Sequence, residues 1–271
     1  MIKIDNLHYK FKTTQFEISN LSLEISDGEF VCIIGKNGSG KSTFSKLLAG
    51  LTKFKTGNIF IDNISLKDKK NFFKIREKVS IVFQNPENQI IFDKVYDDIA
   101  FSLKNLHIPY SEFDTRIEKS LKKVDMLNYK NSSTNELSLG QKQKIAIASA
   151  LAINPSILIL DEPTTMLDPM SKVSIYETLK KLNRSGTTII FVTNFIDEIL
   201  LSDKIVLFDE GNIKKVFYKK DLFENLNLLK DFLAPGIVSI LIKLHQNNIN
   251  VDIENFSLDT ITEEIKKSLI Q

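Results

Sequence analysis

The order of apolar and polar residues predicts short strands that alternate with helices. Residues 2–12 and 16–25 partly alternate between apolar and polar side chains, which is typical of strands with one buried face. Residues 30–34 form a short apolar run, and residues 42–51 place their apolar side chains on one side of a helix. Buried strands followed by helices indicate an α/β domain with a mainly parallel sheet.

The pattern changes in the middle of the chain and again near its end. Residues 95–139 carry apolar residues at helical spacing and are interrupted by a polar cluster at 131–135. Alternating strands and helices then resume, before the pattern ends in helix, loop and helix. We therefore expect one domain over residues 1–221, with a helical subdomain at about 84–153, and a small helical appendage over residues 222–271.

Charge balance and the length of the apolar runs limit the classes of function. The 271 residues include 36 basic and 34 acidic side chains, which gives a formal net charge of +2. A dedicated nucleic-acid binder usually has a basic face, so we expect no nucleic-acid partner. No apolar run reaches the ~18 residues that span a bilayer, and the start of the chain lacks the apolar core of a signal peptide. If the protein works at a membrane, we expect a partner to hold it there.

A glycine-rich segment after the run at 30–34 fits the phosphate-binding motif G-x-x-x-x-G-K-[ST]. Glycines let successive backbone N–H groups turn toward phosphate oxygens, and the following helix adds the positive end of its dipole. Lys41 can reach the β- and γ-phosphates of a nucleotide, and the Ser42 hydroxyl can bind Mg²⁺. The predicted nucleotide-binding residues are Gly35, Lys36, Asn37, Gly38, Ser39, Gly40, Lys41, Ser42 and Thr43.

Two adjacent carboxylates follow a second apolar run, at residues 156–160. Acidic side chains at the end of a buried strand are costly to desolvate, which favours a functional role for both. Asp161 can hold a metal ion through water, and Glu162 can take a proton from an attacking water molecule. The alternative, in which both acids only cap the next turn, is weakened by the phosphate-binding motif upstream.

Further motifs resemble those of ABC-transporter ATPase subunits. Gln84 follows a predicted strand, as does the family's glutamine that touches Mg²⁺ and the attacking water. Residues 165–168 match the family's loop just after the catalytic glutamate. The resemblance covers about residues 1–220. Residues 137–141 read Leu-Ser-Leu-Gly-Gln, and three of them match the family signature L-S-G-G-Q: Ser138, Gly140 and Gln141.

The resemblance implies a phosphate-loop ATPase fold with an antiparallel N-terminal β part and a helical subdomain. It also implies that ATP and Mg²⁺ are bound, and that two ATPase subunits pair head to tail with two ATP molecules between them. In such a pair the signature of one subunit closes over the γ-phosphate held by the other; ATP closes the dimer and hydrolysis reopens it. An aromatic side chain before the motif stacks on adenine in this family. Phe11 fits best and Tyr9 second, although aromatic residues are also ordinary in strands.

Residues 83–89 and 97–101 resemble more closely the ATPases of energy-coupling factor transporters. These systems take up vitamins or transition-metal ions through a separate substrate-binding membrane subunit, and two ATPases dock on one transmembrane coupling subunit. The resemblance implies a peripheral protein on the cytoplasmic side of the cell membrane, paired with a paralogue or with another copy of this chain. Residues 85–92 then receive the coupling subunit, unless they form a solvated loop. The alternative is an ATPase subunit of another ABC importer or of an exporter.

Two residues depart from the family's pattern. Leu139 replaces the first glycine of the signature and cannot adopt a positive φ as cheaply. Asn194 stands where the family has a histidine that contacts the γ-phosphate; its amide can donate a hydrogen bond but is neutral and does not titrate. We count Asn194 among the catalytic residues, together with Glu162 and Gln84. The hypothesis is that this chain's site binds ATP but hydrolyses it slowly, as one half of an asymmetric dimer.

The appendage has helical apolar spacing at residues 232–244 and 260–270. The resemblance implies that this region ties two ATPase subunits together. The alternative is that it covers the chain's own sheet, because an amphipathic helix shows only that one of its faces is buried. Both interpretations remain open on the sequence.

Overall fold

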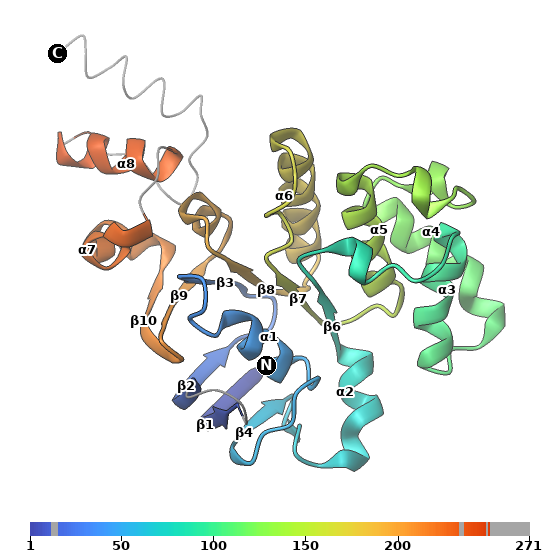
Figure 1. Cartoon of the computed structure of the whole chain (residues 1–271), viewed down its shortest axis with the longest axis horizontal. Coiled ribbons are helices and arrows are strands. Elements are labelled where there is room, and N and C mark those ends of the chain that lie inside the picture. The colour runs from blue at the N-terminus through green and yellow to red at the C-terminus, as the bar shows by residue number, and fades with distance from the viewer. Residues whose placement is uncertain (12–15, 233–235, 248, 250–271) are drawn as a thin grey trace, which may run out of the picture.

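The computed structural model describes residues 1–11, 16–232, 236–247 and 249, which form two β-sheets with helices around them (Figure 1). The larger sheet has the strand order β10-β9-β3-β8-β7-β6, and its neighbouring strands are parallel except for β10 and β9. The prediction of an α/β fold with a mainly parallel sheet is confirmed. The strands are β3 (Phe30–Gly35), β6 (Val79–Val82), β7 (Ile157–Asp161), β8 (Thr188–Thr193), β9 (Lys204–Asp209) and β10 (Asn212–Tyr218).

The smaller sheet is the antiparallel N-terminal part of the fold, with the strand order β2-β1-β4-β5. Helix α1 shares one core with both sheets. In that core Ile4 and Ile59 of the small sheet join Phe44 of α1, and Ile33 and Val192 of the central strands. The elements are β1 (Ile2–Lys10), β2 (Glu17–Ile25), α1 (Lys41–Leu48), β4 (Thr56–Ile61) and β5 (Ile64–Ser65).

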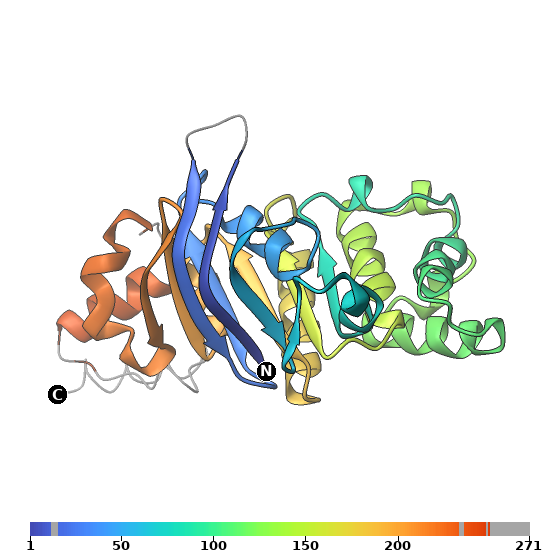
Figure 2. The ribbon, with the colours of Figure 1, turned by 90° about the horizontal axis from the view of Figure 1, so that it is seen from below.

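A helical subdomain packs beside the larger sheet and shares a second core with it. Helix α5 contacts α3, α4, α6 and strand β6. Val95, Ile117 and Ile145 of the helices lie in one cluster with Leu158 and Phe191 of the strands. Figure 2 shows α3, α4 and α5 at one end of the molecule and the C-terminal helices at the other. The helices of the subdomain are α3 (Val95–Asn105), α4 (Phe113–Lys123) and α5 (Leu139–Ala152), and the helices beside it are α2 (Phe72–Lys78) and α6 (Pro169–Arg184).

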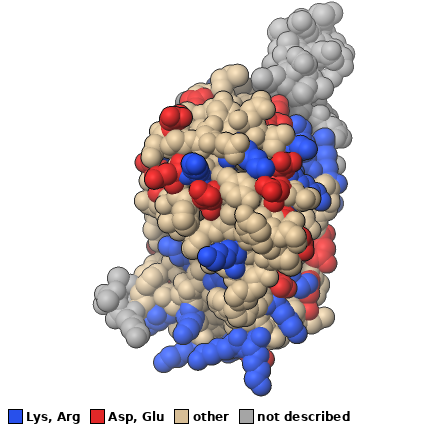
Figure 3. All heavy atoms as spheres, turned by 90° about the vertical axis from the view of Figure 1, so that its right-hand side faces the viewer, with Lys and Arg blue, Asp and Glu red and all other residues tan. Residues whose placement is uncertain are grey.

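The outer surface of the helical subdomain is charged. Figure 3 views this face and shows acidic and basic side chains together on its upper half, and mainly basic side chains at its lower edge. Helix α4 illustrates the pattern, because it buries Phe113, Ile117 and Leu121 and surrounds them with charged residues. Of the helices that the structure describes, none combines the length and the apolar character needed to cross a membrane.

The C-terminal helices cover the part of the larger sheet around β3 and β9. Val238 and Leu241 of α8 are fully buried in a cluster with Ile34 and Leu207. In the described residues, α8 therefore covers the chain's own sheet. The helix predicted at 260–270 lies outside the described residues. The helices are α7 (Leu226–Leu229) and α8 (Ile237–Gln246).

Candidate active site

The glycine-rich residues 35–43 form the turn from β3 into α1. Gly35 ends the strand, and a Cβ atom there would lie 2.3 Å from the carbonyl oxygen of Phe208. Gly40 precedes the first residue of α1 and has a φ of +103°, a conformation that favours glycine. The backbone therefore curls tightly before the helix N-terminus, which is the geometry of a phosphate cradle.

Lys41 is the buried cation of this cradle. Its side chain is 3% exposed, and its Nζ donates hydrogen bonds to the carbonyl oxygens of Gly35 (2.7 Å) and Lys36 (2.9 Å). Burial lowers the pKa of Lys41, while the nearby carboxylates of Glu162 and Asp161 oppose that shift. The lysine thus lies across the loop, where its Nζ can replace its hydrogen bonds to the carbonyl oxygens with hydrogen bonds to phosphate oxygens. The side chain of Lys36 lies elsewhere, paired with Asp231 at 2.6 Å, so Lys36 contributes its backbone to the cradle.

Ser42 and Asp161 form a pair of oxygen ligands beside the cradle. The Ser42 hydroxyl donates to Asp161 Oδ1 at 3.0 Å across the space between α1 and β7. Asp161 is 5% exposed; burial raises the pKa of its carboxyl group, and hydrogen bonds from Ser42 and Ser45 counteract this. Hydroxyl and carboxylate oxygens suit Mg²⁺, which commonly takes one or two protein ligands and completes its shell with phosphate and water. The residues present therefore fit that ion.

Glu162 is held apart from Asp161 and beside Gln84. Gln84 Nε2 donates to Glu162 Oε2 at 3.2 Å, and the Thr165 hydroxyl donates to the same oxygen at 3.4 Å. Glu162 has a φ of +49°, in the left-handed region that non-glycine residues rarely adopt. Burial raises the pKa of Glu162, Lys41 opposes this rise, and Asp161 adds to it. A carboxylate with a raised pKa is a better proton acceptor, so Glu162 suits a general base.

Asn194 lies directly after β8 and faces the phosphate loop. Its Nδ2 donates to Asn37 Oδ1 at 3.2 Å. Its own side-chain oxygen and the Ser39 hydroxyl oxygen are buried without a hydrogen-bond partner among the described residues. Buried polar groups are normally paired. Two unpaired groups at this loop fit a site that a polar ligand completes.

A hollow of about 310 Å³ opens over the loop and is bordered by aromatic rings. Phe11 lines it, as the sequence predicts for an adenine-stacking residue. Its ring also contacts that of Tyr9, with ring centroids 5.0 Å apart. Phe16, which the sequence reasoning missed, lines the same hollow and lies directly over Gly40. The sequence feature that could have indicated Phe16 is its place as an aromatic residue at the start of the second predicted strand. The other residues that line the hollow are Gly38, Gly40, Lys41, Ser42 and Thr43.

The signature residues lie at the start of α5, in the helical subdomain, and Figure 1 shows this helix separated from α1. Ser138 caps the helix: its hydroxyl accepts from Gln141 N–H at 3.3 Å, and Gln141 Oε1 accepts from Ser138 N–H at 2.9 Å. Leu139 is the first residue of the helix and has no positive φ, so the expected backbone cost does not arise. A Cβ atom at Gly140 would lie 2.4 Å from Ser171 Oγ of α6. Because α5 lies apart from α1, the signature residues of one chain do not reach the phosphate loop of the same chain.

Comparison with known proteins identifies the family. Residues 18–165, more than half of the chain, match the family described as ABC transporter. The chain belongs to the ABC transporter ATPase family. It is 40% identical over 269 residues to the energy-coupling factor transporter ATP-binding protein EcfA1 of Fusobacterium nucleatum, with 99% of this chain and 100% of that protein covered. It is also 40% identical to EcfA1 of Oenococcus oeni, with 92% of this chain and 91% of that protein covered.

Solved structures of ABC ATPases share the fold. CbiO1 of Clostridium perfringens, part of the ABC transporter complex CbiONQ, is 34% identical with a TM-score of 0.76, and the match covers 85% of this chain and 93% of that one. The ATP-binding cassette MJ0796, in a dimeric post-hydrolysis state with ADP and Pi, is 32% identical with a TM-score of 0.71. The match covers 80% of this chain and 98% of that one. The predicted resemblance to energy-coupling factor ATPases is confirmed. This ABC ATPase is thus an ATP-binding and ATP-hydrolysing protein.

Proposed function

We propose that this chain powers the uptake of a micronutrient, a vitamin or a metal ion, as an ATPase subunit of an energy-coupling factor importer. The observation that carries ATP hydrolysis is the meeting of Lys41, the Ser42–Asp161 pair and the Gln84–Glu162 pair around one phosphate cradle, and the likeness to EcfA1 proteins supports the importer role. An ATPase needs these three elements together: a cation for the phosphates, oxygen ligands for Mg²⁺, and a base beside a water-orienting group.

The proposed mechanism assigns one task to each group. Lys41 binds the β- and γ-phosphates after it leaves the loop carbonyls, and the Asn194 amide donates to the γ-phosphate. Ser42 and Asp161 would hold Mg²⁺, directly or through water, and the bound ion would supply positive charge to the phosphates. Gln84 orients the attacking water, and Glu162 takes a proton from that water. Glu162 Oε1 lies 3.9 Å from Lys41 Nζ.

The test is phosphate release from ATP by the purified chain, alone and mixed with its partner ATPase subunit. The expected result is Mg²⁺-dependent hydrolysis that stops when the ion is chelated. Hydrolysis that continues after chelation would contradict the assigned metal site. Absence of hydrolysis in both preparations would contradict the proposed function.

We further propose that the catalytic unit is a head-to-tail dimer, with a paralogue or with a second copy of this chain. Ser138 is exposed at the N-terminus of α5, so its hydroxyl and the helix dipole are available to a γ-phosphate held by another subunit. The described part of the C-terminal region covers the chain's own sheet through α8 and leaves Ile240 exposed at 43%. We propose that this exposed side contributes to pairing.

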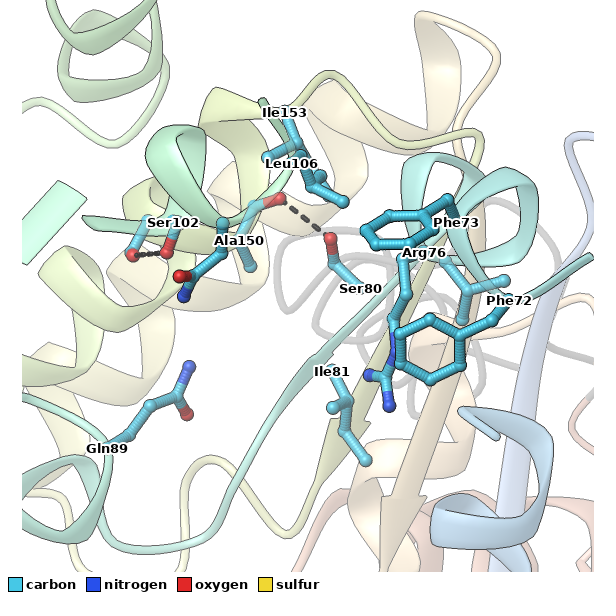
Figure 4. Close-up of a pocket in the computed structure, with 13 residues that line it drawn as sticks. Phe72, Phe73, Arg76, Ser80, Ile81, Gln89, Ser102, Leu106, Ala150 and Ile153 are labelled. Atoms are coloured by element: carbon cyan, nitrogen blue, oxygen red, sulfur yellow. Dashed lines mark hydrogen bonds between the residues drawn. The ribbon is translucent and has the colours of Figure 1, made fainter. Parts of the chain in front are cut away.

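The groove between α2, β6 and the helical subdomain is the proposed docking site for the transmembrane coupling subunit. It forms a cavity of about 330 Å³, and Figure 4 shows Phe72 and Phe73 on one side of it and Gln89 on the other. Phe72 and Phe73 are 50% and 52% exposed. Gln89 Oε1 accepts the backbone N–H of Phe83 at 3.0 Å, next to Gln84. A helix in this groove would therefore touch the segment that carries a catalytic residue. It would hold the chain at the cytoplasmic face of the cell membrane, where a separate membrane subunit supplies the substrate.

Replacing both exposed phenylalanines, Phe72→Ser with Phe73→Ser, is expected to weaken binding to the detergent-solubilised coupling subunit by at least about tenfold, because exposed aromatics are frequent interface anchors. ATP hydrolysis by the chain without membrane subunits should stay unchanged. Titration of the coupling subunit against immobilised ATPase measures the affinity. Tyr110→Ser, at a side chain that is 77% exposed and outside the groove, is the matched control. Equal affinities for all three proteins would refute the docking site.

A second candidate function follows from Asn194. The chain would be the half of an asymmetric heterodimer that binds ATP but hydrolyses it slowly, because a neutral amide replaces the family's histidine at the γ-phosphate. Asn194→His is then expected to raise turnover at this chain's site by about 3- to 10-fold. Single-turnover hydrolysis in the assembled dimer measures this, and Asn194→Ala is expected to stay at or below the wild-type rate. A histidine variant that is no faster would show that asparagine is an adequate replacement.

A further inference from the structure

Glu198 is a buried carboxylate behind the candidate active site. It belongs to the short 3-10 segment Ile196–Leu201 that follows Asn194, and it is 4% exposed. It accepts hydrogen bonds from three hydroxyl groups. The Thr164 and Tyr176 hydroxyls donate to Oε1, each at 2.5 Å, and the Thr193 hydroxyl donates to Oε2. A buried carboxylate is costly unless it is well paired, and here the described partners are hydroxyl groups.

These hydroxyl groups come from the segments that carry the catalytic groups. Thr164 lies two residues after Glu162, and Thr193 immediately precedes Asn194. The Thr193 oxygen also accepts the backbone N–H of Phe195 at 2.9 Å, which fixes the turn around Asn194. Glu198 therefore joins the loop of the general base to the loop of the phosphate-contacting amide through one carboxylate.

The backbone at Glu162 requires such support. Its positive φ is unfavourable for a residue with a side chain and persists only where the surroundings hold it. One link is the backbone hydrogen bond from Glu162 N–H to the Val192 carbonyl oxygen, at 2.9 Å. The Thr164–Glu198 bond provides a second link, two residues further along the same loop. Tyr176 adds a third attachment, to helix α6.

We propose that Glu198 is a positioning residue for ATP hydrolysis, which holds Glu162 and Asn194 in register with each other through Thr164 and Thr193. The proposal rests on the catalytic role given above to Glu162. Glu198 is buried and its described partners are hydroxyl groups, so it acts by fixing where the base and the amide lie when ATP occupies the cradle. Misplacing a catalytic group by about 1 Å can cost orders of magnitude in rate.

The test uses the full chain assembled with its partner ATPase. Glu198→Gln keeps the shape of the side chain but removes the charge and leaves one acceptor oxygen for three donors. It is expected to lower kcat by about tenfold or more, with the KM for Mg-ATP and the affinity for a fluorescent ATP analogue within about twofold of wild type. Asp197→Asn is the matched control, because Asp197 lies in the same segment but caps α8 by accepting Val238 N–H at 2.9 Å. It should keep wild-type kcat.

A second pair of variants tests the same link without changing charge. Thr164→Val removes the hydroxyl group at nearly constant volume and is expected to lower kcat about as much as Glu198→Gln, whereas Thr164→Ser should retain the wild-type rate. A Glu198→Gln protein with wild-type kcat, or one whose losses of kcat, ATP affinity and Tm run in parallel, would overturn the proposal. If Glu198→Gln does not fold, equal kcat values for Thr164→Val and Thr164→Ser would overturn it. Full activity of Glu162→Gln in the same assay would instead overturn the role of Glu162.

Discussion

Glu162→Gln is expected to lower Mg-ATP hydrolysis by about 100-fold or more, because a glutamine amide keeps the shape of the side chain but cannot accept a proton from water. The hydrogen bonds from Gln84 and Thr165 can be retained at the remaining amide oxygen, so the local structure should persist. Phosphate release by the assembled dimer measures the loss. ATP affinity should be unchanged, and the dimer should accumulate in its ATP-bound state, which size-exclusion chromatography with ATP detects.

The control for this prediction is Glu177→Gln, at an exposed glutamate on α6. It makes the same chemical change away from the cradle and should keep full activity. If Glu162→Gln retains more than about a tenth of the wild-type rate, another group takes the proton and the assignment of the base is wrong.

Lys41→Met is expected to weaken ATP binding by about 10- to 100-fold, since charge-assisted hydrogen bonds to phosphate are each worth roughly 1.5–3 kcal/mol. Methionine has a similar volume and an apolar stem, so it can fill the same buried space and Tm should change little. Titration of a fluorescent ATP analogue measures the affinity, and a thermal melt without nucleotide checks the fold.

Lys46→Met is the matched control for this substitution. Lys46 lies on the exposed side of α1, five residues after Lys41. Its charge acts on Asp161, but it makes no contact with the loop carbonyls among the hydrogen bonds of the described residues, so its replacement should change ATP affinity far less than Lys41→Met does. Equal losses for the two variants would show that the general positive charge of α1, and not the cradle lysine, binds the phosphates.

The cradle and the carboxylate pair were predictable because they depend on local sequence. Residues 35–43 form a strand-to-helix turn whose glycines are fixed by short-range geometry, and Asp161 and Glu162 follow an apolar strand directly. Neighbouring parallel strands bring their carboxyl ends to one edge, so the meeting of β3, β7 and β8 follows from the topology.

The residues that the sequence did not predict act through contacts between distant segments. Phe16, just before β2, lies over Gly40 of the phosphate loop, and Glu198 contacts Thr164 from 34 residues away. Gln89 lies in the segment 85–92 that the sequence assigned to the coupling subunit, but its hydrogen bond from the Phe83 N–H depends on the folded loop. At Leu139 the sequence predicted a backbone cost that the structure does not show. Leu139 lies in the first turn of α5, where no positive φ is needed. Spacing alone does not distinguish a loop conformation from a helix start.

The placement of Ser138 and the phosphate loop on separate parts of one chain has a consequence for when ATP is consumed. On the proposed head-to-tail dimer, a subunit without a partner has no signature serine over its γ-phosphate, so it is expected to hydrolyse almost no ATP. Pairing is bimolecular, and specific activity should therefore fall on dilution. In that arrangement, assembly of the dimer would itself start ATP hydrolysis.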